Sequence, residues 1–229
     1  EGSQETPTLK DERVPTKEEL KRIFLAADPQ QRVACVLLAH AGLRPESLGN
    51  YEGNYGLKVC DLPEIEVHPR KHELIFKKIP SIVVVIPIIS KAGHQYFSFL
   101  TSEGCQYAKE YLEKRMRQGE PLDHNSPILT PQKDSTSKKV GSHITTTNVG
   151  DMIRSAIRKA VFKWRPYVLR SFFDTQLMIA ESKGLTLRDH RTFFMGHKAD
   201  IKNRYTANKG RLPEQVIEHM RSSFKKASE

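Results

Sequence analysis

Four side chains stand in contexts that suit reactive or ligand-binding roles. Arg44 comes directly before Pro45, a residue suited to the first turn of a helix, so its guanidinium is expected beside unpaired helix-start amides. That combination holds a phosphate group well. Arg170 falls near the core boundary of a later helix, where an unpaired guanidinium is costly unless an anion or a carboxylate meets it. His197 follows a glycine that ends a helix, and Tyr205 comes eight residues later.

Each of these residues also has a purely structural interpretation. Arg44 could cap its own surface loop, and Arg170 could pair with Asp174 four residues along the same helix. A histidine after a helix stop is usually structural, and a tyrosine such as Tyr205 is usually a packing residue. Taken one at a time, the four residues therefore do not decide a function.

The elements that must position them begin with two helices. The Thr16 side chain can accept from the amide of Glu19 while Glu19 reaches back, a capping box that predicts a helix through about Ala27. A second helix is predicted from Gln30 to Ala41 by its apolar stripe. Gly42 supplies the left-handed stop that ends it, two residues before Arg44.

The middle third changes to short β-branched or aromatic runs, which predict a small antiparallel sheet. The predicted strands are Leu57 to Cys60, Glu64 to His68, Glu73 to Lys77, Ile82 to Ile89 and Tyr96 to Leu100. Between the last two lies Ser90-Lys91-Ala92-Gly93-His94, a glycine-bearing turn whose side chains stand off the sheet. Lys91 is therefore expected at the tip of a hairpin.

The remainder is predicted to be helical apart from one loop, Pro121 to Ser142. The predicted helices are Ser102 to Arg117, Thr147 to Trp164, Tyr167 to Lys183, Thr186 to Met195, Ile201 to Asn208 and Pro213 to Lys225. One face of the helix that starts at Thr147 is apolar, and the other is basic. This basic face carries Arg154, Arg158, Lys159 and Lys163.

The overall charge indicates the class of partner. The chain holds 37 Lys and Arg residues against 27 Asp and Glu residues, a formal charge of +10 that favours nucleic acid. It has no run of eighteen apolar residues, no signal peptide and only three scattered cysteines, which predicts a soluble protein of the reducing cytosol. Pro69 separates His68 from His72, and there is no phosphate-binding Gly-x-x-x-x-Gly-Lys loop, so neither a metal nor another cofactor is expected.

Taken together in chain order, these segments resemble the motifs of the tyrosine recombinases, the phage-type integrase family. The family pattern is an arginine in a Gly-Leu-Arg-x-x-Glu-Leu-like box, a hairpin lysine, a second box of the form His-x-x-Arg, a Gly-His pair and a nucleophilic tyrosine. The resemblance covers about residues 14 to 208. It assigns to the active site Arg44, Lys91, Arg170, His197 and Tyr205.

Three details depart from the family pattern. The first position of the second box, commonly His or Lys, is Tyr167, which could hydrogen-bond a phosphate oxygen but gives up a proton at neutral pH less easily than an imidazole. The interval from His197 to Tyr205 is about one residue shorter than usual. In the first box, Ser47 precedes Leu48 where leucine usually follows the glutamate directly.

The resemblance implies a specific reaction on double-stranded DNA. Tyr205 would attack a phosphate to give a 3′-phosphotyrosine, which conserves bond energy, so that a 5′ hydroxyl can reverse the step without ATP or metal. Arg44 and Arg170 would clamp the non-bridging oxygens, and His197 would add a hydrogen bond. Lys91 would protonate the leaving 5′ oxygen.

The resemblance also implies a fold and an assembly. The expected fold is the tyrosine-recombinase catalytic domain, α+β and mostly helical with a small antiparallel sheet, over residues 13 to 229, with residues 1 to 12 as a linker or disordered tail. The amino-terminal core-binding domain of the family is expected to be missing. Recombination in this family uses four protomers on two duplexes, so a homotetramer is expected on DNA, and the isolated fragment could be monomeric. Pro213 to Lys225 could be exchanged between protomers or could close its own core.

Two other functions would use the same residues. A type IB-like topoisomerase or a telomere resolvase shares the active-site chemistry, although the chain lacks a topoisomerase's long coiled-coil insertion. A non-catalytic DNA-binding module would keep the scaffold alone, and the joint presence of all five site residues argues against it. The prediction is therefore a recombinase that integrates or excises a mobile element and acts in the cytoplasm on nucleoid, viral or plasmid DNA.

Overall fold

The computed structural model describes residues 13–131, 142–197 and 212–228, and within these ranges the chain is mostly helical. The helices are α1 (Lys17–Ala26), α2 (Pro29–Ala39), α3 (Pro45–Leu48), α4 (Ser102–Arg117), α5 (Thr146–Lys159), α6 (Tyr167–Ser182), α7 (Arg188–Phe194) and α9 (Glu214–Ser228). The strands are β1 (Ile65–His68), β2 (Glu73–Phe76), β3 (Ser81–Val85) and β4 (Tyr96–Leu100). Short 3-10 turns are η1 (Val59–Asp61), η2 (Pro69–Lys71) and η3 (Pro87–Ile89). The predicted α+β class, mostly helical, is confirmed.

The strands form two separate antiparallel pairs instead of the single sheet that was predicted. β1 pairs with β2, and β3 pairs with β4 with Val85 opposite Tyr96. The predicted strand Ile82 to Ile89 is too long, because Pro87 has no N–H for a strand ladder and starts η3. The long connection from η3 to β4 carries Lys91.

The predicted strand Leu57 to Cys60 is wrong. The chain turns there into η1, and the carboxylate of Asp61 accepts a hydrogen bond from the Lys58 amide at 2.8 Å. A side chain that bonds the backbone three residues earlier competes with strand pairing, which is the usual role of aspartate at turns. Leu57 and Val59 are buried, and the run pairs with the segment around Pro127 only through an isolated antiparallel bridge at Lys58.

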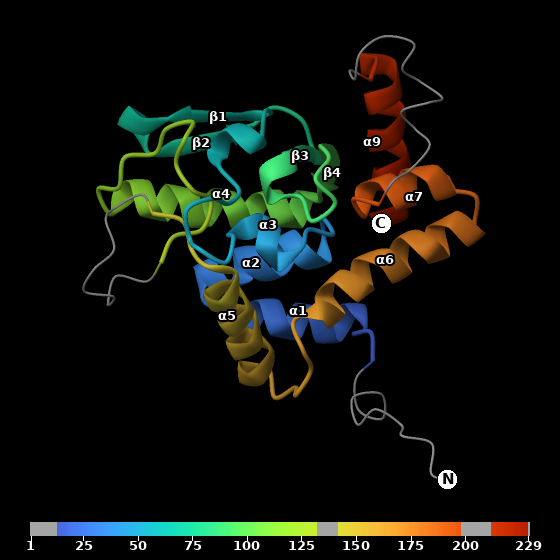
Figure 1. Cartoon of the computed structure of the whole chain (residues 1–229), viewed down its shortest axis with the longest axis horizontal. Helices are drawn as coiled ribbons and strands as arrows, with labels where there is room; N and C mark the ends of the chain where they lie inside the picture. The colour runs from blue at the N-terminus through green and yellow to red at the C-terminus, as the bar shows by residue number, and fades with distance from the viewer. Residues whose placement is uncertain (1–12, 132–141, 198–211, 229) are drawn as a thin grey trace.

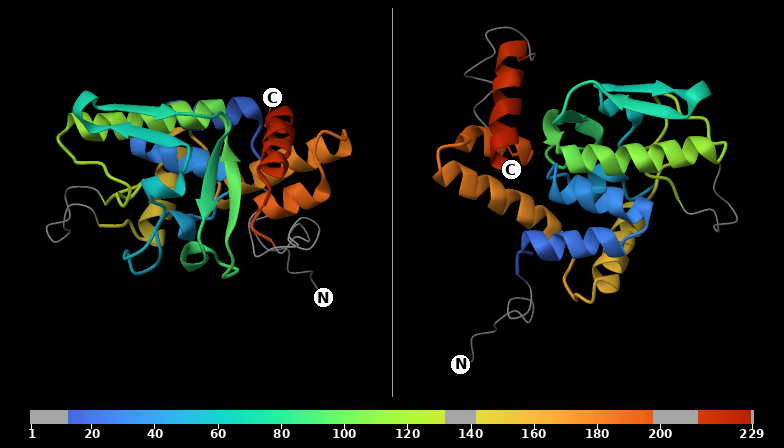
Figure 2. Two further views of the ribbon diagram at one scale, coloured as in Figure 1. Left: turned by 90° about the horizontal axis from the view of Figure 1, so that it is seen from above. Right: turned by 180° about the vertical axis from the view of Figure 1, so that it is seen from behind.

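The elements gather at two ends of the molecule. At one end the β1–β2 hairpin lies against α4, and at the other end α6, α7 and α9 group together (Figure 1). The view from behind shows the same division (Figure 2). Helix α2 contacts α4, α5 and α6 and therefore joins the two ends.

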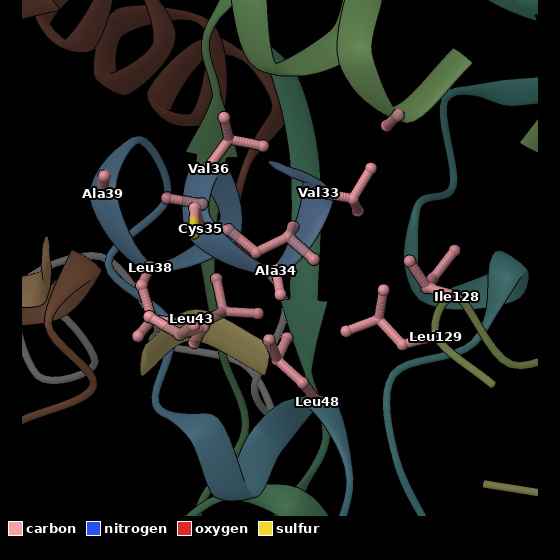
Figure 3. Close-up of a cluster of buried hydrophobic side chains, with 14 of the residues drawn as sticks. Val33, Ala34, Cys35, Val36, Leu38, Ala39, Leu43, Leu48, Ile128 and Leu129 are labelled. Carbon is pink, nitrogen blue, oxygen red and sulfur yellow. The ribbon is translucent and has the colours of Figure 1, made fainter. Parts of the chain in front are cut away.

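Helix α2 is the centre of the core. Its residues from Val33 to Ala39 are all buried, as expected for a helix that is apolar all round. Leu43 and Leu48 after the helix, and Ile128 and Leu129 from a distant segment, pack around it (Figure 3). Full burial of an aliphatic side chain stabilises the fold by about 1.5–3 kcal/mol. This cluster therefore fixes the path of the segment that follows α2.

The ends of the first two helices follow the sequence closely. Thr16 and Glu19 form both bonds of the predicted capping box, at 3.2 and 2.9 Å. Gly42 has φ of +68°, the left-handed conformation predicted for it, and its amide donates to the Leu38 carbonyl. The chain therefore leaves α2 with a fixed direction towards Arg44.

Helix α9 packs on its own chain. Met220 and Phe224 are buried at 0% and 2% exposure, in a second hydrophobic cluster that also holds Phe99, Phe173, Leu177, Phe194 and Met195. The apolar stripe of this helix therefore closes its own core, the second of the two roles considered for it. Exchange between protomers stays a prediction.

Helix α5 ends at Lys159, earlier than the predicted Trp164. The helix stops in a Schellman motif, in which the Val161 amide donates to the Arg158 carbonyl at 2.9 Å and the Phe162 amide to the Ile157 carbonyl at 3.1 Å. Val161 takes the left-handed position with φ of +69° and is 83% exposed. A β-branched residue in this position is strained.

We expect Val161→Gly to raise the free energy of unfolding by about 1 kcal/mol, because glycine adopts this backbone conformation without the clash of a branched side chain. The measurement is urea denaturation followed by circular dichroism, with the midpoint rising and the slope unchanged.

Gly119 gives the matched control, because it fills the same position of the same motif at the end of α4 with φ of +84°. No atom lies within 4 Å of a Cβ built there, so Gly119→Ala tests the backbone alone and should lower stability by about 1 kcal/mol. A loss of stability in Val161→Gly would show that the valine side chain contributes more than its strain costs.

Candidate active site

Arg44 occupies the N-cap of α3, directly before Pro45, as predicted. Leu43 and Leu48, both buried in the core, hold the segment on either side of it. A Cβ on Gly42 would lie 2.4 Å from the ring of Phe173, so the absence of a side chain there lets α6 approach. Arg44 itself is half-buried at the start of α3.

Arg170 joins three segments that are far apart in the sequence. This side chain of α6 is 1% exposed, and its Nε and Nη2 donate to the carbonyls of Gly42 at 2.8 Å and Met195 at 2.5 Å. Neither acceptor carries a charge. The predicted alternative pairing with Asp174 is wrong, because Asp174 accepts from Nε of Arg191 at 2.8 Å. Burial, followed by the nearby charge of Arg44, lowers the pKa of Arg170.

His197 is presented by a glycine stop, as predicted. Gly196 has φ of +65°, and the His197 amide donates to the Thr192 carbonyl at 3.1 Å, which closes the end of α7. Arg170 donates to the carbonyl of Met195, two residues before His197, and to that of Gly42, two residues before Arg44. Burial, followed by the charges of Arg170 and Arg44, lowers the pKa of His197. Arg44, Arg170 and His197 are thus brought together.

Tyr96, the first residue of β4, is a member of this cluster that the sequence did not reveal. Its ring is 3% exposed, and a Cβ on Gly196 would lie 2.5 Å from its Cζ. Burial raises the pKa of Tyr96, and the charges of Arg170 and Arg44 oppose that rise. Nothing in a strand pattern distinguishes this tyrosine from an ordinary core residue, so the sequence offered no way to find it.

The hairpin turn that carries Lys91 is anchored to α3. Gly93, with φ of +65°, donates to the Ser90 carbonyl at 3.0 Å and closes the turn, with Lys91 exposed at its tip. Ser47 Oγ donates to the Ile89 carbonyl at 2.8 Å. Ser47 departs from the family pattern and belongs to the helix that Arg44 caps. Its hydrogen bond therefore ties the turn to that helix.

Of the two remaining predicted site residues, the structure describes Tyr167 and not Tyr205. Tyr167, the first residue of α6, is 56% exposed, and its electrostatic interaction with Arg170 partly offsets the lowered pKa of that guanidinium. Tyr205 and the predicted helix Ile201 to Asn208 lie outside the described residues.

The predicted basic face of α5 divides into two pairs. Arg154 forms an ion pair with Asp151, and Lys159 Nζ donates to Gln31 Oε1 at 2.9 Å. Arg158 and Lys163 are exposed. Within the predicted DNA-binding set, Arg154 and Lys159 therefore already bind other residues of the protein, whereas Arg158 and Lys163 are exposed.

Acidic, histidine and cysteine side chains do not gather into a metal site in the described part of the chain. Across 13–131, 142–197 and 212–228, no group of three or more His, Cys, Asp or Glu side chains is placed to hold a metal ion. The same ranges contain no helix long and apolar enough to cross a membrane.

Overall similarity to known proteins is found by comparing structures. No protein-family model matches the chain, and no curated protein matches its sequence. The XerA recombinase structure matches with a TM-score of 0.55 and 20% identity over 92% of this chain. An integrase from mycobacterium phage Brujita matches with a TM-score of 0.52 and 15% identity over 94%. The fold is that of a tyrosine-recombinase catalytic domain.

The recombinase fold is shared over only part of those proteins. The matches cover 64% of the XerA recombinase chain and 57% of the integrase chain. The predicted tyrosine-recombinase fold is thus confirmed, with two strand pairs in place of one sheet. At these identities the match establishes the arrangement of the backbone, and the chemistry has to be argued from the side chains.

We expect Arg44→Ala to raise the pKa of His197, because a nearby positive charge disfavours the protonated imidazole. The measurement is an NMR titration of the His197 ring, with Arg158→Ala as a control because that exposed cation is not among the groups that act on His197. An unchanged His197 titration in Arg44→Ala would place Arg44 outside the cluster.

Proposed function

We propose that this chain is the catalytic domain of a DNA recombinase, which breaks and rejoins DNA strands through a phosphotyrosine on Tyr205. The observation that carries the proposal is the position of Arg170. Its two hydrogen bonds link the segments that hold Arg44 and His197. Three widely separated motifs of the predicted active site therefore meet in a fold shared with a recombinase and an integrase.

The two arginines suit the charge that develops on a phosphate under attack. Arg44 is half-buried at a helix start, so its guanidinium can bond a non-bridging oxygen directly. Arg170 is buried beneath it, where its charge is poorly screened and its orientation is fixed by two backbone carbonyls. Preorganised charge of this kind commonly lowers a barrier by about 3–4 kcal/mol for each donor.

The other predicted site residues supply hydrogen bonds and a proton. A neutral His197 can hydrogen-bond the phosphate, and its lowered pKa favours the neutral form near pH 7. Tyr167, exposed at the start of α6, can add a second hydrogen bond. Lys91 is the general acid that protonates the leaving 5′ oxygen, since its turn is anchored beside Arg44 through Ser47.

Tyr205 is the nucleophile that the resemblance assigns. It lies eight positions after His197, and an extended chain of that length spans at most about 29 Å, so its oxygen can reach the cluster. The Tyr205 hydroxyl gives its proton to the neutral His197 ring as its oxygen attacks phosphorus, the bond to the 5′ oxygen breaks, and a proton from Lys91 completes the leaving hydroxyl. Reversal by a 5′ hydroxyl restores the phosphodiester, so neither ATP nor a metal is needed.

The wider protein surface suits a duplex. A formal charge of +10 attracts a polyanion, and exposed cations on α5 and in the turn after it can contact phosphates. Assembly of four protomers on paired recombination sites, and action on a mobile element, belong to the same proposal.

We expect the wild-type protein to leave DNA covalently attached to itself, and Tyr205→Phe to leave none, because the substitution removes only the attacking oxygen. The protein is incubated with genomic fragments, denatured, and the attached DNA is sequenced. Tyr55→Phe is the matched control, since Tyr55 is 41% exposed in a loop outside the cluster. An adduct that survives in Tyr205→Phe would reassign the nucleophile, and its absence from the wild type would contradict strand cleavage.

We expect Arg158→Ala with Lys163→Ala to weaken DNA binding and to reduce the slope of log affinity against log salt by about two, roughly one for each phosphate that is no longer neutralised. Fluorescence anisotropy on a random duplex measures this slope. Arg154→Ala with Lys159→Ala removes the same charge from residues already bound to Asp151 and Gln31, so it should change the slope less. Equal effects of the two double variants would show that the salt dependence follows total charge alone.

A further inference from the structure

The turn between η3 and β4 holds two buried polar atoms without a hydrogen-bond partner in the described part of the chain. These are Ser90 Oγ and His94 Nδ1. Most buried polar side-chain atoms in proteins are hydrogen-bonded, and leaving one unpaired destabilises the fold. Both atoms belong to the same five-residue turn as Lys91. A ligand that accepts a hydrogen bond at this turn would satisfy them.

His94 faces the candidate active site. Its ring centroid is 6.2 Å from that of Tyr96, and the Tyr96 ring lies against Gly196, the residue before His197. His94 is also among the groups that lower the pKa of His197. Two imidazoles therefore approach the cluster from opposite elements, His197 from the end of α7 and His94 from the hairpin turn.

The groups around this point favour a tetrahedral oxyanion. Arg44 and Arg170 contribute two guanidiniums, and the two histidines contribute ring nitrogens that can donate a hydrogen bond. The acidic groups that act on this cluster are Asp174, which acts on His197 and is already bonded to Arg191, and Glu46, which acts on Tyr96. A phosphate would therefore meet several donors, with one of these two carboxylates already paired.

We propose that His94, with Ser90 beside it, binds a non-bridging oxygen of the same phosphate that Arg44 holds. This contact draws the turn onto the substrate and so brings Lys91 to the leaving oxygen. His94 is then a phosphate-binding residue supplied by the hairpin, at a site where the second box offers Tyr167 in place of an imidazole. The identity of the phosphate as part of DNA rests on the proposed function, whereas the binding of an anion at His94 does not.

Inorganic phosphate is the probe, titrated at constant ionic strength into protein with isotope-labelled histidine. We expect the ring resonances of His94 and His197 to shift together with one dissociation constant. Those of His68 and His124, which lie on other elements, should stay in place. A shift at His197 without one at His94 would overturn the proposal.

His94→Phe keeps a ring against Tyr96 and removes the nitrogens. We expect it to weaken phosphate binding about tenfold, read from His197, as the loss of one hydrogen bond to a charged group. His68→Phe is the control and should change nothing. Unchanged affinity in His94→Phe would overturn the proposal, and if that variant fails to fold, Ser90→Ala tests the same turn and should also weaken binding.

The result separates this proposal from the proposed function. Phosphate binding at His94 in a protein that forms no DNA adduct would support the site and contradict recombinase activity. An adduct through Tyr205, with His94→Phe binding phosphate as the wild type does, would support the activity and overturn the role of His94.

Discussion

The candidate site depends on one buried guanidinium. Arg170 has almost no exposure to solvent, and it is held by two backbone carbonyls, one before α3 and one after α7. A charge in that position is costly unless every neighbouring segment keeps its place. The close approaches at Gly42 and Gly196 are what let those segments come near, since a side chain at either position would collide with an aromatic ring. The backbone of these segments therefore determines where the side chains of the candidate site lie.

Local patterns in the sequence predicted the elements that need no distant partner. The capping box at Thr16, the left-handed stop at Gly42, and the bounds of α4 and β4 all follow from residues within a few positions. The order of Arg44, Arg170 and His197 along the chain also predicted the fold, which the structural matches bear out. These three residues lie close together, and all three can bind a phosphate. The assignment of Tyr205 depends on the sequence alone.

What the sequence could not show depends on contacts between distant segments. The pairing of Asp174 with Arg191, in place of Arg170, requires α7 to fold back beside α6. The division of strands into two pairs depends on where each hairpin finds its neighbours, and a single run such as Leu57 to Cys60 is as apolar as a true strand. Val161 is the opposite case. Glycine is favoured at this left-handed position, yet a valine occupies it and the helix still ends there.

Burial together with the charge of Arg44 lowers the pKa of Arg170 and of His197, and this has a consequence for the whole protein. Like charges gathered in one place repel, so the site works against the compact state that holds it. The hydrophobic cluster around α2 must supply the compensating cohesion. The arrangement that suits the proposed phosphate binding is then opposed to folding stability, and a polyanion bound as proposed would relieve the repulsion and stabilise the fold by mass action. Selection for tighter packing alone would therefore not produce this arrangement of charges.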